Sequence, residues 1–120
     1  VVPDGTGGPD SGGVVVADTR GDALLFFRLG PEARMERKVV LPGSPYGLAF
    51  DATRRRLWVT LTATNQLAGF DLSGSAATPT EPFVTLPTVR QPNSVAVDPA
   101  SGRVFVAGAT DATLQVIDPR

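Results

Sequence analysis

The sequence repeats itself at an offset of 47 residues, and this repeat limits the fold more than any other feature. Residues 45–72 align without a gap with residues 92–119. The identical pairs are Pro45/Pro92, Ala49/Ala96, Asp51/Asp98, Arg56/Arg103, Val59/Val106, Leu67/Leu114 and Asp71/Asp118. A third copy lies upstream at an offset of 43, where residues 14–17 match 57–60 and residues 24–29 match 67–72. A tandem repeat of this length predicts a row of equivalent structural units.

Each repeat unit is expected to contain four short β-strands. Glycine (13 residues) and proline (11 residues) are spread along the chain between short apolar runs, which is typical of many turns. In the second unit we expect strands at 47–50, 57–61, 67–72 and about 82–86, with a hairpin turn at 51–55 and a connection at 62–66. The first unit places its fourth strand at about 38–41, within a stretch (31–40) of faint helical character. Four strands in about 45 residues predict the blades of a β-propeller.

The second strand of each unit is apolar at successive positions, as in Leu57-Trp58-Val59 and Val104-Phe105-Val106. A strand of this kind has to be covered on both faces, which a sheet between two neighbouring sheets achieves. An ordinary β-sandwich is the structural alternative, but it would not predict near-identical repeats. We therefore predict an all-β chain of about two and three-quarter blades, with units at approximately 1–44, 45–91 and 92–120. The first strand is truncated to residues 1–4, and a longer turn spans 4–13.

A closed propeller needs roughly four to eight blades, more than this chain supplies. We expect the missing blades to come from the same or another chain, with the present chain as the C-terminal part of a longer propeller. The alternative is that several short chains complete one ring. Uncovered apolar faces and a bare sheet edge also favour self-association.

Composition excludes several classes of function. The net charge of −1 gives no electrostatic footprint for nucleic acid, and no apolar stretch is long enough for a transmembrane helix. Cysteine and histidine are both absent, which removes thiolate nucleophiles, Cys-based zinc sites and the commonest general base. We predict no cofactor, no metal site and no catalytic residue.

Residues 92–99, 102–107 and 114–118 (PNSVAVDP, GRVFVA and LQVID) resemble the YVTN family of propeller repeats. Phe105 and Trp58 stand where that family typically has tyrosine, and residues 16–19 also resemble the related NHL repeat. The resemblance implies a bacterial, WD-like binding scaffold that is extracellular, periplasmic or in the cell envelope. It implies nothing specific about the ligand, because one scaffold carries many functions.

Ligand sites in propellers of this kind lie on the face formed by two sets of loops. These connect the second strand to the third, and one unit to the next. The polar and aromatic residues expected there are Asp18, Arg20, Asp22, Tyr46, Asn65, Gln66, Arg90, Asn93 and Asp111. The alternative is that such residues only form turns and bond to nearby backbone groups. We expect that structural role for Asp51, Asp98, Asp71 and Asp118, and blade packing for Trp58 and Phe105.

The leading prediction for function is a non-enzymatic propeller that binds a protein or small-molecule ligand. The alternative is a fragment of a propeller enzyme, either a lactonase-like metal-dependent hydrolase or a quinoprotein-type oxidoreductase. That alternative would need oxygen ligands converging on one ion, for example from Asp18, Asn65 and Asp111.

Overall fold

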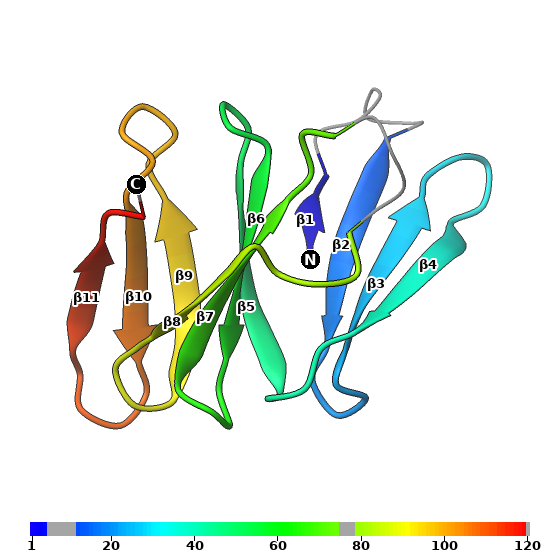
Figure 1. The fold of residues 1–120 in the computed structure, drawn as a ribbon. Coiled ribbons are helices and arrows are strands. Elements are labelled where there is room, and N and C mark those ends of the chain that lie inside the picture. The colour runs from blue at the N-terminus through cyan, green and yellow to red at the C-terminus, as the bar shows by residue number, and fades with distance from the viewer. Residues whose placement is uncertain (5–11, 75–78, 120) are drawn as a thin grey trace.

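The chain folds into three antiparallel β-sheets in the computed structural model, which describes residues 1–4, 12–74 and 79–119 (Figure 1). The first sheet consists of β1 (Val2–Pro3), β2 (Gly13–Asp18), β3 (Ala23–Arg28) and β4 (Arg34–Val40). The second consists of β5 (Pro45–Asp51), β6 (Arg56–Leu61), β7 (Gln66–Asp71) and β8 (Val84–Pro87). The third consists of β9 (Pro92–Val97), β10 (Val104–Gly108) and β11 (Leu114–Ile117). Among the described residues, no helix could cross a membrane.

The strand register repeats from sheet to sheet at the offsets found in the sequence. The pair Leu57↔Phe70 joins β6 to β7, and the corresponding pairs are Val14↔Phe27 in the first sheet and Val104↔Ile117 in the third. These pairs are separated by the same 43 and 47 residues as the sequence copies. The internal similarity is therefore also a similarity of backbone pairing.

The second sheet lies between the other two, as Figure 1 shows. Leu57 and Val59 pack toward the first sheet, in a cluster with Val15 and Leu24. Trp58, which points the opposite way, packs against Val104 and its neighbours in the third sheet. Successive residues of β6 thus enter two different cores, because side chains alternate between the faces of a strand. The prediction that both faces of this strand are covered is confirmed.

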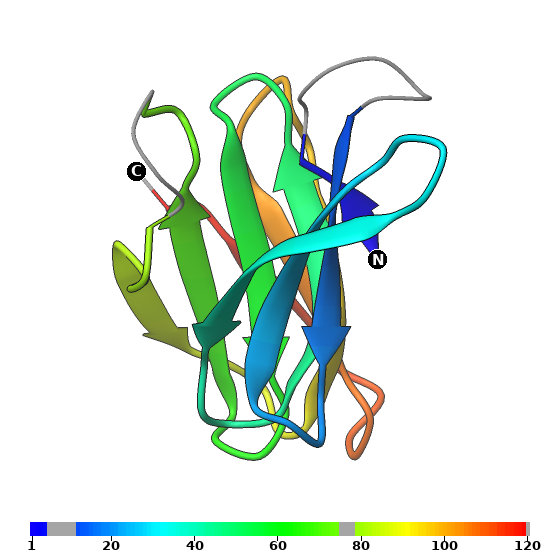
Figure 2. The same cartoon turned by 90° about the vertical axis from the view of Figure 1, so that its right-hand side faces the viewer.

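The equivalent strands of the sheets share one side of the stack. In the turned view of Figure 2, β1 lies on the right and β8 on the left, and β4 runs diagonally across the view to end on the same side as β8. Glycine brings the first strands of neighbouring sheets close together. A Cβ atom added to Gly47 in β5 would lie 3.0 Å from the backbone oxygen of Asn93 in β9.

Three expected strand limits were wrong. The fourth strand of the first sheet begins at Arg34 instead of residue 38, β5 begins at Pro45 instead of residue 47, and β8 covers Val84–Pro87 instead of about 82–86. The early start of β4 has a physical reason, since Arg34 pairs with Arg28 and Met35 with Phe27 along the free edge of β3. This pairing draws the faintly helical stretch into a strand. Most of the expected long turn at 4–13 falls outside the described residues.

Candidate functional site

The candidate ligand-binding residues gather at one end of the stack, which we call the loop end. It contains the β2–β3, β6–β7 and β10–β11 turns and the connections from β4 to β5 and from β8 to β9, at the bottom of Figure 1. The residues predicted from the sequence at this end are Asp18, Arg20, Asp22, Tyr46, Asn65, Gln66, Arg90, Asn93 and Asp111. They lie in these turns and connections, or in the first two positions or the last position of the adjoining strands.

Two threonines link neighbouring sheets at the loop end. The Thr19 hydroxyl donates a hydrogen bond of 2.7 Å to the backbone oxygen of Pro45, and the Thr62 hydroxyl donates one of 2.7 Å to that of Pro92. Each threonine follows the second strand of one sheet, and each proline begins the first strand of the next. These two bonds therefore fix the position of each strand start against the preceding turn.

Replacing Thr62 with valine is expected to lower the free energy of unfolding by about 1 kcal/mol, a typical cost for one hydrogen bond. Valine keeps the shape of the side chain but leaves the buried Pro92 without this donor. Urea denaturation measures the loss. Thr64→Val, in the same turn but exposed, is the matched control, and an equal effect of both variants would contradict the role given to Thr62.

The side chains of Asp22 and Asn65 accept hydrogen bonds from backbone amides at equivalent places in the first two sheets. Asp22 Oδ1 accepts a hydrogen bond from the Ser44 amide at 2.9 Å, and Asn65 Oδ1 accepts one from the Gln91 amide at 2.8 Å. Both residues have positive φ angles, 50° and 56°, which aspartate and asparagine tolerate better than most side chains. The equivalent residue of the third sheet is Ala112, with φ 48° and no side-chain acceptor.

A chain of hydrogen bonds crosses from the second sheet to the third. The backbone amide of Gln91 donates a hydrogen bond to Asn65 Oδ1, and the side-chain Oε1 of Gln91 accepts one of 2.6 Å from the Thr110 hydroxyl. Asp18 has a local role, because its Oδ1 accepts from the amide of Gly21 in the same turn. The sequence reasoning missed Gln91, Thr110 and both linking threonines. Only the repetition of Thr19 at Thr62 carried a signal that could have identified any of them.

The remaining predicted residues are divided by exposure. Arg20, Arg90 and Asp111 are exposed, and Tyr46 is 57% exposed. Within the described residues, no hydrogen bond or ion pair engages these four side chains. Gln66 and Asn93 are half-buried at the starts of β7 and β9. The loop end thus combines turns fixed by backbone hydrogen bonds with exposed arginine, tyrosine and aspartate side chains.

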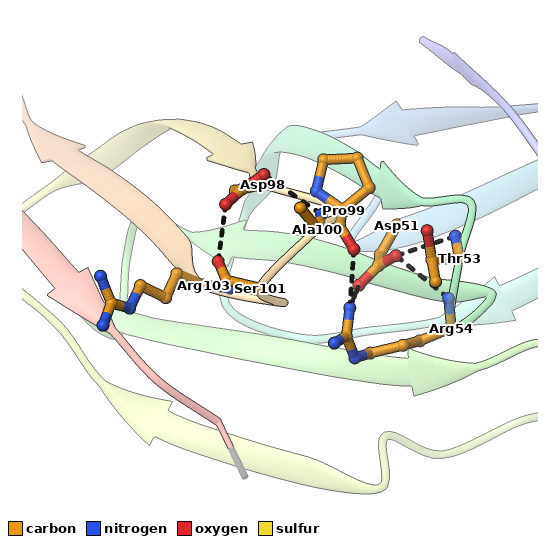
Figure 3. Close-up of polar contacts among 8 residues, drawn as sticks. All are labelled: Asp51, Thr53, Arg54, Asp98, Pro99, Ala100, Ser101 and Arg103. Atoms are coloured by element: carbon orange, nitrogen blue, oxygen red, sulfur yellow. Dashed lines mark hydrogen bonds and ion pairs between the residues drawn. The ribbon is translucent and has the colours of Figure 1, made fainter.

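The opposite end, which we call the hairpin end, is held by carboxylates (Figure 3). Asp51 Oδ1 accepts from the amides of Thr53 and Arg54, and Asp98 Oδ1 accepts from the amide of Ala100. Asp71 Oδ1 likewise accepts from the Ser73 amide. The predicted turn-forming role of these three aspartates is confirmed.

Arg54 joins the hairpins of two neighbouring sheets. Its Nη1 atom lies 3.2 Å from Asp51 Oδ2 and donates a 2.9 Å hydrogen bond to the backbone oxygen of Pro99 (Figure 3). The guanidinium lies over Gly102, where an added Cβ would be 2.9 Å from Arg54 Cζ. The neighbouring Arg56 stacks over the Phe83 ring, with 5.0 Å to its centroid. The basic run at 54–56 is therefore engaged in packing the hairpins and strand ends.

Acid is expected to weaken the fold through Asp98 and Asp71. The hydroxyl of Ser101 holds the pKa of Asp98 below its ordinary value of 3.8, and that of Ser73 does the same for Asp71. Because the pKa of each carboxyl is lower in the folded than in the unfolded state, the ionised aspartates stabilise the fold. This stabilisation is complete above pH 3.8 and is lost as the pH falls through the folded-state pKa values. Urea midpoints measured from roughly pH 6 down to pH 2 should therefore fall less in the double variant D71N/D98N than in the unaltered chain. Parallel curves for the two proteins would rule out this contribution.

Two further features of the described residues bear on a possible site, a metal centre and a surface hollow. Within the described part of the chain, no group of three or more acidic, histidine or cysteine side chains is placed to hold a metal ion. A shallow hollow of about 380 Å³ lies beside the β3–β4 hairpin. It is lined by Arg28, Leu29, Gly30, Pro31, Glu32, Arg34 and Glu36.

Comparison with known proteins gives a result for the fold alone. No protein-family model matches the sequence, and no curated protein matches it. Among solved structures, the β-propeller domain of Cps50 (Swd1) from Myceliophteria thermophila is similar with a TM-score of 0.68 and 12% identity, over 90% of this chain and 37% of that one. Hydrazine synthase from Kuenenia stuttgartiensis is similar with a TM-score of 0.59 and 14% identity, over 88% of this chain and 44% of that one. A functionally unknown protein from Desulfotomaculum acetoxidans is similar with a TM-score of 0.51 and 13% identity, over 92% of this chain and 42% of that one.

The chain therefore consists of β-propeller blades, two with four strands and one with three among the described residues. It spans 37–44% of the length of these three solved chains. Its blades correspond to part of a larger propeller.

Proposed function

We propose that this chain is part of a non-enzymatic propeller of the YVTN type, related to NHL repeats, that binds a protein partner through its loop end. The observation that carries the proposal is the exposure of Arg20 and Arg90 on turns, and of Tyr46 at the start of β5, where hydrogen bonds between sheets hold the backbone in place. Tyrosine and arginine are the residue types that most often contribute the binding energy of protein interfaces. Turns that are already ordered lose little conformational entropy when a partner binds.

The charges at the loop end favour a partner of mixed polarity. Arg20 and Arg90 lie in the same set of loops as Asp18, Asp22 and Asp111, so neither sign dominates. Asp18 and Asp22 already accept hydrogen bonds from backbone amides, whereas Arg20, Arg90 and Asp111 are exposed. We propose that the partner is a peptide segment with an aromatic or apolar residue for Tyr46 and carboxylates for the arginines. On the family resemblance, the proposed location is extracellular, periplasmic or in the cell envelope, which fractionation of the source cells would test.

A random peptide library displayed on phage and selected against the chain tests the binding face. Peptides recovered on the unaltered protein should bind the double variant R20A/R90A at least tenfold more weakly, and Y46A should show a similar loss. The matched control is R34A/R103A, which removes the same charge from two exposed arginines outside the loop end. Peptides that keep their affinity for R20A/R90A and Y46A, or lose it only for the control, would refute the proposed face.

A further inference from the structure

The fourth strand of the first sheet has an edge with hydrogen-bonding groups that face away from the sheet. Among the described residues, β4 pairs only with β3. The Leu41 amide donates a 2.7 Å hydrogen bond to the backbone oxygen of Asp22, which lies opposite it one pair beyond Ala23↔Val40. Hydrogen-bonded and non-hydrogen-bonded pairs alternate along an antiparallel ladder. The amides and carbonyls of Lys38 and Val40 therefore point away from β3, toward the free edge.

The equivalent edge strand of the second sheet is protected, whereas β4 is not. β8 has four residues, follows Pro82 closely and ends at Pro87. Short strands and prolines are usual means of keeping a sheet edge from pairing with another chain. β4 has seven residues and contains no proline. Its side chains include two exposed apolar ones, Met35 at 52% and Val40 at 66%.

The free edge of β4 lies on the outside of the propeller. The first strands of neighbouring sheets converge, as the close approach of Gly47 to Asn93 shows, and in a propeller the sheets surround a central channel. β4 is at the opposite side of its sheet from β1, and it ends on the same side as β8 in Figure 2. Further sheets at either end of the stack would pack on sheet faces, so they would leave this edge on the circumference.

The charged side chains of β4 are mostly cationic. Within the described residues, no ion pair engages Arg34, Arg37 or Lys38, and the buried Nε atom of Arg37 has no hydrogen-bond partner. The one acidic residue of the strand, Glu36, already lies 3.4 Å from the Nε atom of Arg28. Opposite charges on adjacent strands stabilise their pairing, and like charges oppose it. The edge is therefore complementary to a strand that carries carboxylates.

We propose that β4 binds an extended acidic segment of another protein, which adds a strand to the first sheet. Backbone hydrogen bonds supply the affinity in this mode of recognition, and alternate side chains supply the specificity. An antiparallel segment would place an apolar residue beside Val40 and acidic residues beside Lys38 and Arg37. This surface is separate from the loop end and goes beyond the function proposed for it.

Fluorescence anisotropy with a labelled, end-blocked peptide of the sequence TVTEETT tests the edge. The peptide should bind saturably, with its valine beside Val40 and its glutamates beside Lys38 and Arg37. The matched peptide TVTKKTT should bind about tenfold more weakly or less, because its charges repel those of the strand. The variant R20A/R90A should bind TVTEETT as tightly as the unaltered protein, so this proposal and that for the loop end can fail separately.

N-methylation of the peptide distinguishes an added strand from attraction between charges. The amides of the valine and the first glutamate would face β4, and methylating both should weaken binding about tenfold or more. Methylating the threonine between them and the second glutamate is the matched control, because those amides would face solvent. On the protein, Lys38→Pro removes an outward amide and should weaken binding more than Lys38→Gln, which removes only the charge.

Circular dichroism and urea midpoints show whether Lys38→Pro still folds, and the methylated peptides give the same test on the unaltered protein. The absence of saturable binding of TVTEETT at millimolar concentration would overturn the proposal, and the cations would then only guard the edge against pairing. Equal effects of the two methylation patterns, or no effect of either, would also overturn it, because binding would then not use the backbone of β4.

Discussion

Replacing Trp58 with alanine is expected to lower the free energy of unfolding by about 3–5 kcal/mol, the usual cost of removing a large aromatic side chain from a core. Trp58 is 0% exposed and packs on Val104 and Val106, so it joins the second sheet to the third. Its ring also meets Phe83 edge to face, at 5.7 Å between centroids. Alanine would leave a cavity at this interface. Urea denaturation followed by circular dichroism measures the loss.

Trp58→Phe is the matched control for this cavity. The indole Nε1 is buried and has no hydrogen-bond partner within the described residues. Phenylalanine therefore removes an unpaired donor while keeping an aromatic ring, and its cost should be clearly smaller than that of alanine. The position would be less important than we infer if alanine cost under roughly 1 kcal/mol. Equal losses for both variants would mean that the stability depends on the full volume of the indole, and that a smaller aromatic ring cannot fill the site.

The fold was predictable because the information is local and repeated. Leu57, Trp58 and Val59 are apolar in succession, and the structure sends them into two separate cores. The repeat added information that a single strand does not contain. A second strand that is apolar at successive positions, forty-seven residues later, requires a second sheet that is also covered on both faces. Where this pattern is missing, the prediction was wrong. The stretch Arg34–Val40 has no apolar alternation in its first half, and only its pairing with β3 makes it a strand.

The candidate site was predictable only in its location. The repeat brought the chosen residues to one end of the stack, but it could not show which of them already hydrogen-bond to the backbone. Asp22 and Asn65 are both committed to amides twenty-two and twenty-six residues away. Such bonds depend on how one sheet lies against the next, and no spacing within a single strand encodes that. The link from Arg54 to Pro99, forty-five residues apart, was unpredictable for the same reason.

Replacing Asp51 with alanine is expected to lower the free energy of unfolding by about 2–3 kcal/mol, because several donors would lose their acceptor in a buried place. Asp51 is 1% exposed and accepts from the amides of Thr53 and Arg54. It also holds the Arg54 guanidinium, which reaches Pro99 in the next sheet. The substitution should therefore loosen one hairpin and the contact between two sheets. The change in urea midpoint at neutral pH measures the effect.

The repeat provides its own control for this prediction, since Asp98 occupies the equivalent place forty-seven residues later. Asp98 also bonds to its hairpin, through the Ala100 amide and the Ser101 hydroxyl. The difference lies in burial and reach, because Asp98 is half-exposed and holds no arginine that crosses to another sheet in the described structure. Water can replace its bonds, so Asp98→Ala should shift the urea midpoint clearly less than Asp51→Ala. Equal shifts would show that the turn alone accounts for the stability, and that the bridge between hairpins adds nothing.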